Sequence, residues 1–148
     1  MERSILLDNE HENNVSFINA FQQEGENLLV IELCPFEILE EFMRRRGCLH
    51  ENDVRRLGHQ LIEGVIHLHD MGFLHRDLRP ENALFSEVMV PTVADLASLS
   101  IVATAAEGSG ICGTYWFIPA KLARKGRYST KLVYKGDIFT VMYLKLSY

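Results

Sequence analysis

The sequence of 148 residues predicts an α+β fold, because strand-like and helix-like segments follow one another in blocks. Two short apolar segments separated by a polar turn come early in the chain. A long amphipathic segment occupies the middle, and further short apolar segments come after it. The length is sufficient for one domain or for a large part of one.

The first two apolar segments are predicted to form a β-hairpin. Residues 15–21 read V-S-F-I-N-A-F, and residues 28–33 read L-L-V-I-E-L. Runs rich in β-branched and aromatic residues are typical of strands. The polar residues 22–27 contain Gly25, which favours a turn, and Pro35 is expected to end the second strand.

Two helices are predicted to follow the hairpin. Residues 37–46 predict a short helix that ends at Gly47, and residues 51–71 predict a longer helix that ends at Gly72. Each large apolar side chain on the longer helix contributes roughly 1.5–3 kcal/mol when it is buried, so this helix needs a packing partner. Its predicted apolar face consists of side chains three and four positions apart: Val54, Leu57, Leu61, Val65 and Leu68.

The second half of the chain contains shorter predicted elements. Short strands are expected around residues 83–85 and 92–94. Residues 97–113 are rich in alanine, serine and glycine and are expected to be mobile. Residues 137–146 are strongly apolar and predict a helix.

Composition and charge restrict the possible partners and compartments. A net charge of -5 without a basic face argues against nucleic acid as a partner. The only basic run, residues 44–46, is interpreted as a solvated helix end favoured by the helix dipole. No apolar run approaches the ~20 residues needed to span a bilayer, so no membrane association is expected. The three cysteines lack framework spacing and no signal peptide follows Met1, which together predict a reducing, cytoplasmic location.

The most informative motif is the string H-R-D-L-R-P-E-N at residues 75–82. It contains the carboxylate of Asp77, the cation of Arg79 and the carboxamide of Asn82 within one turn restricted by Pro80. A phosphoryl-transfer site needs such groups. A carboxylate accepts the proton of an attacking hydroxyl, a cation offsets charge on the moving phosphoryl group, and an amide oxygen binds magnesium.

With the following Ala83-Leu84-Phe85, the string resembles the catalytic loop of serine/threonine protein kinases. Further segments match the family in the expected order. Residues 95–97 lie where the family has D-F-G, residues 112–114 match C-G-T, and residues 136–139 match the start of the long central helix, whose aspartate braces the catalytic loop.

The resemblance implies a kinase-like fold that is mostly helical. Residues 1–148 would form a partial kinase domain, with a small-lobe remnant and hinge at 1–34 and a partial large lobe at 35–148. The implied activity is transfer of the γ-phosphate of ATP to a serine or threonine hydroxyl of a protein substrate, with Mg²⁺ as the metal.

The catalytic roles implied by the resemblance fall on five residues. Asp77 would orient and deprotonate the substrate hydroxyl, and Thr114 would lie near it. Asn82 and Asp95 would hold Mg²⁺ against the phosphates. Arg79 stands where the family usually has lysine and would keep the positive charge in a planar group.

The resemblance also implies a nucleotide site. Glu32 to Cys34 would form the hinge that binds adenine through backbone groups, with Ile31 at the back of the pocket. Glu37 falls near the position that often contacts ribose, and Leu84 is assigned to the nucleotide site as well.

Several departures from the family pattern reduce the expected activity. No lysine precedes Lys121 and no glycine precedes Gly25, so the phosphate-gripping lysine and the glycine loop of the small lobe are absent from the sequence. Ala97 replaces the glycine of D-F-G, and Lys121 replaces the glutamate of A-P-E. We therefore expect a truncated enzyme with weak or no transfer by itself.

Three alternatives remain open from sequence alone. Besides a truncated enzyme, the chain could be a catalytically inactive pseudokinase or interaction module, or the unstable product of a decayed gene. For the interaction module, a partner would cover apolar faces that are otherwise exposed. A metal site that joins His67 and His69 is not expected, because side chains two residues apart on a helix point about 200° from each other.

Overall fold

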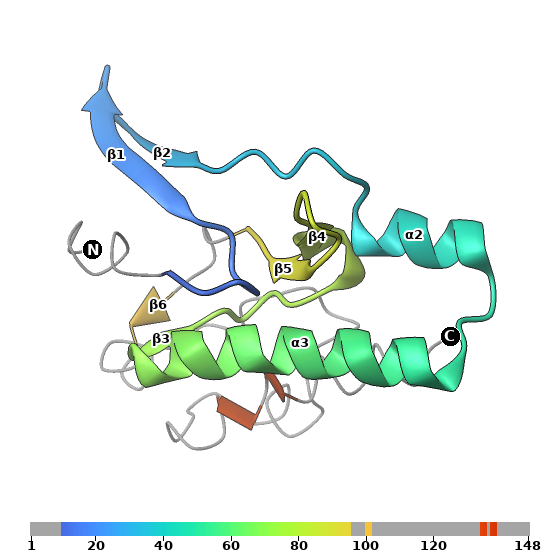
Figure 1. Ribbon diagram of the computed structural model, residues 1–148. Helices are drawn as coiled ribbons and strands as arrows, with labels where there is room; N and C mark the ends of the chain where they lie inside the picture. The colour runs from blue at the N-terminus through green and yellow to red at the C-terminus, as the bar shows by residue number, and fades with distance from the viewer. Residues whose placement is uncertain (1–9, 96–99, 102–133, 136, 139–148) are drawn as a thin grey trace, which may run out of the picture.

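The computed structural model describes residues 10–95, 100–101, 134–135 and 137–138 (Figure 1). This part of the chain contains helices α2 and α3, a 3₁₀ turn, three short antiparallel strand pairs and the helical residues 134–135 and 137–138, in agreement with the predicted α+β class. The elements, in chain order, are β1 (Phe17–Gln23), β2 (Glu26–Ile31), α2 (Leu39–Arg46), α3 (Glu51–Asp70), β3 (Phe73–Leu74), η1 (Pro80–Asn82), β4 (Ala83–Phe85), β5 (Pro91–Val93) and β6 (Ser100–Ile101).

Strands β1 and β2 form the predicted hairpin, which extends away from the helices in Figure 1. Its turn is shorter than expected, because pairing continues to Gln23 and Glu26. The two residues between them, Glu24 and Gly25, have φ values of 54° and 86°. Two consecutive left-handed residues match the right-handed twist of the strands, which explains the tight turn.

Both predicted helices are present. Helix α2 begins two residues later than predicted and ends at Arg46. It is followed by Gly47, whose φ of 68° suits a glycine. Helix α3 begins after His50, whose side chain accepts a hydrogen bond from the Asn52 N–H at 3.3 Å. It ends at Asp70, one residue before the predicted boundary, and Gly72 follows with φ 81°.

The apolar core lies where α2 and α3 pack against β4 and β5. The rings of Phe42 on α2 and Phe85 on β4 have centroids 4.9 Å apart. Most of the predicted apolar face of α3 is buried in this core: Leu57, Leu61, Val65 and Leu68. Val54, the fifth predicted member, is only half-buried near the start of the helix.

The short strands were predicted in part. The β4–β5 pair agrees with the expectation, with Ala83 opposite Val93. The β3–β6 pair was missed, because Ser100–Ile101 falls in a segment that was expected to be mobile. The rest of residues 97–113 lies outside the described residues. Of the predicted helix 137–146, only residues 137 and 138 are described, and both are helical.

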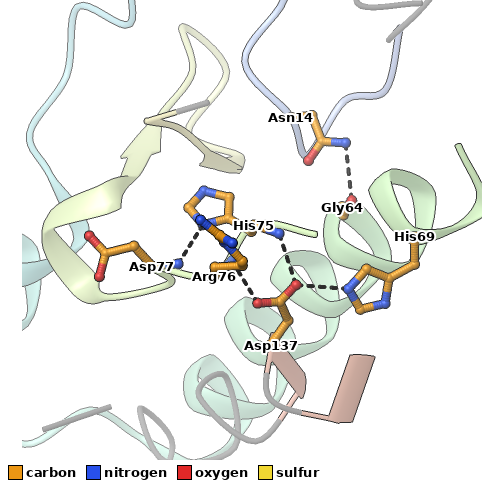
Figure 2. A network of polar contacts seen from close by, with 7 residues as sticks. All are labelled: Asn14, Gly64, His69, His75, Arg76, Asp77 and Asp137. Atoms are coloured by element: carbon orange, nitrogen blue, oxygen red, sulfur yellow. Dashed lines mark hydrogen bonds and ion pairs between the residues drawn. The ribbon is translucent and has the colours of Figure 1, made fainter. Parts of the chain in front are cut away.

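A short extended segment before the hairpin fastens it to the core. The Val15 N–H donates to Val93 O at 2.9 Å, and the Val93 N–H donates to Asn13 O at 2.8 Å. The Asn14 side-chain amide donates to the Gly64 carbonyl of α3 at 3.0 Å (Figure 2). Asn13 and Asn14 are both buried, so these bonds satisfy polar groups that water does not reach.

Candidate functional site

The loop 75–79 that joins β3 to η1 is held by a carboxylate from the far end of the sequence (Figure 2). Asp137 is 3% exposed and accepts hydrogen bonds from the backbone N–H groups of His75 at 2.9 Å and Arg76 at 2.8 Å. Its Oδ2 also lies 2.9 Å from His69 Nε2. An ionised carboxylate can only accept, so Nε2 carries the proton in this contact. The role of brace that the resemblance implied for Asp137 agrees with this geometry.

The buried imidazole of His75 connects the loop to the end of β5. Its Nε2 lies 2.7 Å from the carbonyl oxygen of Ala94, which can only accept, so Nε2 is the protonated nitrogen. Nδ1 is then free to accept the Asp77 N–H, 3.4 Å away. One neutral tautomer therefore satisfies both contacts and fixes the backbone on which the Asp77 carboxylate is mounted.

Asp77 and Asn82 are in direct contact. The side-chain amide nitrogen of Asn82 donates to the Asp77 carbonyl oxygen at 2.8 Å and lies 3.3 Å from Asp77 Oδ2. Both partners are acceptors, so the nitrogen of the amide must face Asp77. The amide oxygen is thereby directed elsewhere, and within the described residues it has no hydrogen-bond donor.

Asp95 lies just after β5, next to Ala94, which is hydrogen-bonded to Asn82. The Ala94 N–H donates to the Asn82 carbonyl oxygen at 2.8 Å, so the chain leaves β5 beside the 3₁₀ turn. Asp95 itself is exposed and has a φ of 58°, a left-handed conformation that costs free energy for a residue with a Cβ. The structure therefore brings Asp77 and Asn82 together and places Asp95 next to a residue that is bonded to the same loop.

Arg79 has a neighbour that sequence reasoning did not identify. Its Nη2 lies 3.3 Å from Glu81 Oε1, and the two side chains are 30% and 33% exposed. A pair of this exposure is weakly stabilising, at most about 1 kcal/mol. The guanidinium is nevertheless oriented by it.

The predicted hinge follows β2. The Glu32 N–H donates to Ser16 O at 2.9 Å, and its carboxylate accepts the Ser16 N–H at 3.3 Å. By contrast, the carbonyl of Glu32 and both backbone polar groups of Cys34 make no backbone–backbone hydrogen bond within the described residues. Burial, followed by the charge of Glu32, raises the pKa of the Cys34 thiol, so this cysteine is a poor nucleophile.

The hinge and strand β4 lie against one small apolar cluster. Val15 and Ala94 form its buried centre, and Cys34 and Leu84 pack against it. Ile38, after the hinge, also pairs with Leu84 through an isolated β-bridge. Cys34 and Leu84, both assigned to the nucleotide site from sequence, are thus brought together.

Glu37 is bound by a side chain that the sequence did not point to. The Arg45 guanidinium donates to both carboxylate oxygens, with Nε 3.2 Å from Oε2.

Thr114, predicted to lie near Asp77, falls outside the described residues.

The two histidines near the end of α3 make different contacts. His67 stacks on His11 with ring centroids 4.9 Å apart, whereas His69 contacts Asp137. Within the described ranges, no group of three or more His, Cys, Asp or Glu side chains is placed to hold a metal ion. None of the helices in those ranges is long and apolar enough to cross a membrane.

Comparison with known proteins identifies the family. The model of the protein kinase domain matches residues 1–142. The chain is 28% identical over 131 residues to the serine/threonine-protein kinase plk-1 of Caenorhabditis elegans, which covers 88% of the chain and 20% of that protein. It is 30% identical over 128 residues to the probable serine/threonine-protein kinase fhkD of Dictyostelium discoideum, which covers 83% of the chain and 17% of that protein.

A third relative, the CDPK-related kinase 1 of Arabidopsis thaliana, is 39% identical over 77 residues, which is 51% of the chain and 13% of that protein. The chain therefore spans a fifth or less of the length of these relatives. The family match, which extends over nearly the whole sequence and includes the loop bound by Asp137, shows that the chain belongs to the protein kinase family.

Proposed function

We propose that this chain carries the catalytic loop and nucleotide-binding hinge of a protein serine/threonine kinase that transfers the γ-phosphate of ATP to a protein hydroxyl. The contact between Asp77 and Asn82, on a loop clamped by Asp137, is the observation that supports this proposal most directly. Family membership implies a nucleotide and a protein as substrates. The choice of ATP and of serine or threonine belongs to the proposal.

Asp77 would accept the proton of the attacking hydroxyl. Its backbone is fixed by His75 and its side chain by the Asn82 amide, so the carboxylate is oriented before substrate binds. Arg79 would offset charge on the phosphoryl group, with Glu81 orienting its guanidinium. Thr114 would lie close to Asp77.

The donor set suits Mg²⁺. This ion prefers hard oxygen ligands and is commonly held by one or two side chains together with phosphate and water. The amide oxygen of Asn82, directed away from Asp77, and the exposed carboxylate of Asp95 are such ligands. A bound Mg²⁺ would neutralise phosphate charge at this position.

The nucleotide would lie between the hinge and Leu84. The backbone groups of Glu32 and Cys34 that lack backbone partners would bind the adenine edge, with Ile31 behind it. The division of the chain into a small-lobe part at 1–34 and a large-lobe part at 35–148 is proposed on the same basis. A cytoplasmic location is proposed from the scattered cysteines.

Radiolabelled phosphate transfer to a generic protein substrate tests the proposal, together with binding of Mg²⁺–ATP by calorimetry. We expect measurable ATP binding but weak transfer, because no lysine precedes Lys121. Asp77→Asn should abolish any transfer, whereas Asp53→Asn, on the exposed first turn of α3, should not change it. Strong turnover that depends on Asp77 would refute the expectation of weak phosphate transfer. Absence of nucleotide binding would refute the proposed nucleotide site.

The hairpin is proposed to pack against a further polypeptide segment. Ile18, Phe21 and Leu29 are between 43% and 57% exposed, and Leu33 after β2 is 85% exposed. A two-stranded ribbon with such a surface is marginally stable by itself. Ile18→Thr with Leu29→Thr should lower binding of an apolar dye and self-association in light scattering. Unchanged values for both would contradict the proposed packing.

A further inference from the structure

The carboxylate of Glu37 forms an ion pair with the guanidinium of Arg45. The Arg45 guanidinium donates to both of its carboxylate oxygens, from Nε to Oε2 at 3.2 Å and from Nη2 to Oε1. Glu37 is 24% exposed and Arg45 is 60% exposed, so the carboxylate is the more enclosed partner. Two parallel N–H···O bonds to one carboxylate are a strong and directional form of ion pair.

Helix α2 fixes the cation in this position. Arg45 lies in the last turn of α2, and its guanidinium carbon is 5.8 Å from the centroid of the Phe42 ring. Phe42 is anchored in the core against Phe85, so the platform beneath the guanidinium is rigid. The hydrogen bonds from Arg45 lower the pKa of Glu37, and the charge of Arg46 acts in the same direction.

We propose that Arg45 is a specificity-determining residue that withholds Glu37 from the ribose, so that the chain distinguishes poorly between ATP and its 2′,3′-dideoxy analogue. The inference rests on the proposed function, which places Glu37 near the ribose. A carboxylate that recognises ribose must accept hydrogen bonds from neutral hydroxyls. Such donors compete poorly with two charge-assisted bonds from a preorganised guanidinium.

Calorimetric titration of the whole chain with Mg²⁺–ATP and with Mg²⁺–2′,3′-dideoxy-ATP tests this proposal. The wild-type chain should bind the two nucleotides with equal affinity to within about twofold. Arg45→Met should tighten ATP binding about two- to fivefold, the range expected for releasing an exposed ion pair, and should leave the dideoxy analogue unchanged. The matched control is Arg44→Met, because Arg44 lies in the same turn and is 3.8 Å from Glu41, not paired with Glu37. It should change neither affinity.

A second substitution tests whether the gain in ATP affinity depends on Glu37. Adding Glu37→Met to Arg45→Met should return ATP affinity to that of the dideoxy analogue, since a methionine side chain offers the ribose hydroxyls no strong acceptor. The proposal is overturned if the wild-type chain already prefers ATP clearly, or if Arg45→Met leaves the ratio of the two affinities unchanged. If no variant binds either nucleotide, the proposed function fails and this inference fails with it. If both nucleotides bind but Arg45→Met changes neither affinity, this inference is refuted while the proposed function stands.

Discussion

Replacing Gly64 by alanine should loosen the segment that fastens the hairpin to α3. A Cβ added at Gly64 would lie 2.5 Å from Asn13 O and 2.7 Å from Asn14 Oδ1. Contacts this short do not occur, and the nearest atoms include backbone, so residues 13 and 14 must move away from the helix. The movement strains two sets of hydrogen bonds. One is the bond from the Asn14 side-chain amide to the Gly64 carbonyl, and the other is the backbone pairing of Asn13 with Val93.

The net effect can be worked out from three contributions. Overpacking a tightly packed site costs about 1–3 kcal/mol, and a buried polar group that loses its partner costs about 1–3 kcal/mol more. Alanine in place of glycine within a helix restores about 1 kcal/mol. We therefore expect Gly64→Ala to lower the free energy of unfolding by about 1–5 kcal/mol.

Urea unfolding followed by circular dichroism measures this change, with Gly58→Ala as the matched control. Gly58 lies on the same helix, and a Cβ added there would have no atom within 4 Å. It should raise the free energy of unfolding by about 0.5–1 kcal/mol through helix propensity alone. If Gly64→Ala stabilises the chain as much as Gly58→Ala does, the proposed fastening of the hairpin is wrong.

Two further predictions concern the loop and a histidine of α3. Asp137→Asn should lower the free energy of unfolding by about 1–3 kcal/mol and speed hydrogen exchange at the His75 and Arg76 amides. Unchanged exchange at both amides would show that the carboxylate does not hold the loop. Burial, followed by the charge of His11, lowers the pKa of His67, so the folded chain binds protons there less readily than the unfolded chain. The stability from neutral His67 is present above the ordinary histidine pKa, about 6.5, and is lost as the pH falls below it, by at most about 1.4 kcal/mol per pH unit. Urea midpoints at pH 7.5 and 5.5 should therefore differ less in His67→Gln than in the wild-type chain, and an equal difference would refute the assignment.

Local elements could be read from the sequence because their signals are local. The hairpin follows from two apolar runs around Gly25, and α3 follows from apolar residues at helical spacing that ends at Gly72. The proximity of Asp77 and Asn82 was also expected, because a single turn carries both residues.

The contacts that the sequence did not reveal join positions far apart or depend on side-chain orientation. Asn14 binds a helix carbonyl fifty positions away, and any residue at 64 would supply that carbonyl. The capture of Glu37 by Arg45 depends on where α2 begins, which was predicted two residues too early. The β3–β6 pair contains only two residues in each strand, too few to produce a periodic pattern.

The clamp formed by Asp137 has a consequence for the order in which the protein matures during translation. The H-R-D-L-R-P-E-N string leaves the ribosome well before Asp137, since 62 positions separate His75 from the carboxylate that binds its amide. Domains are completed as their later segments emerge. A nascent chain, or a splice product interrupted between residues 95 and 137, would contain every letter of the motif while its backbone amides still lack their buried acceptor. A transcript that encodes the complete string therefore does not by itself indicate that the loop is ordered.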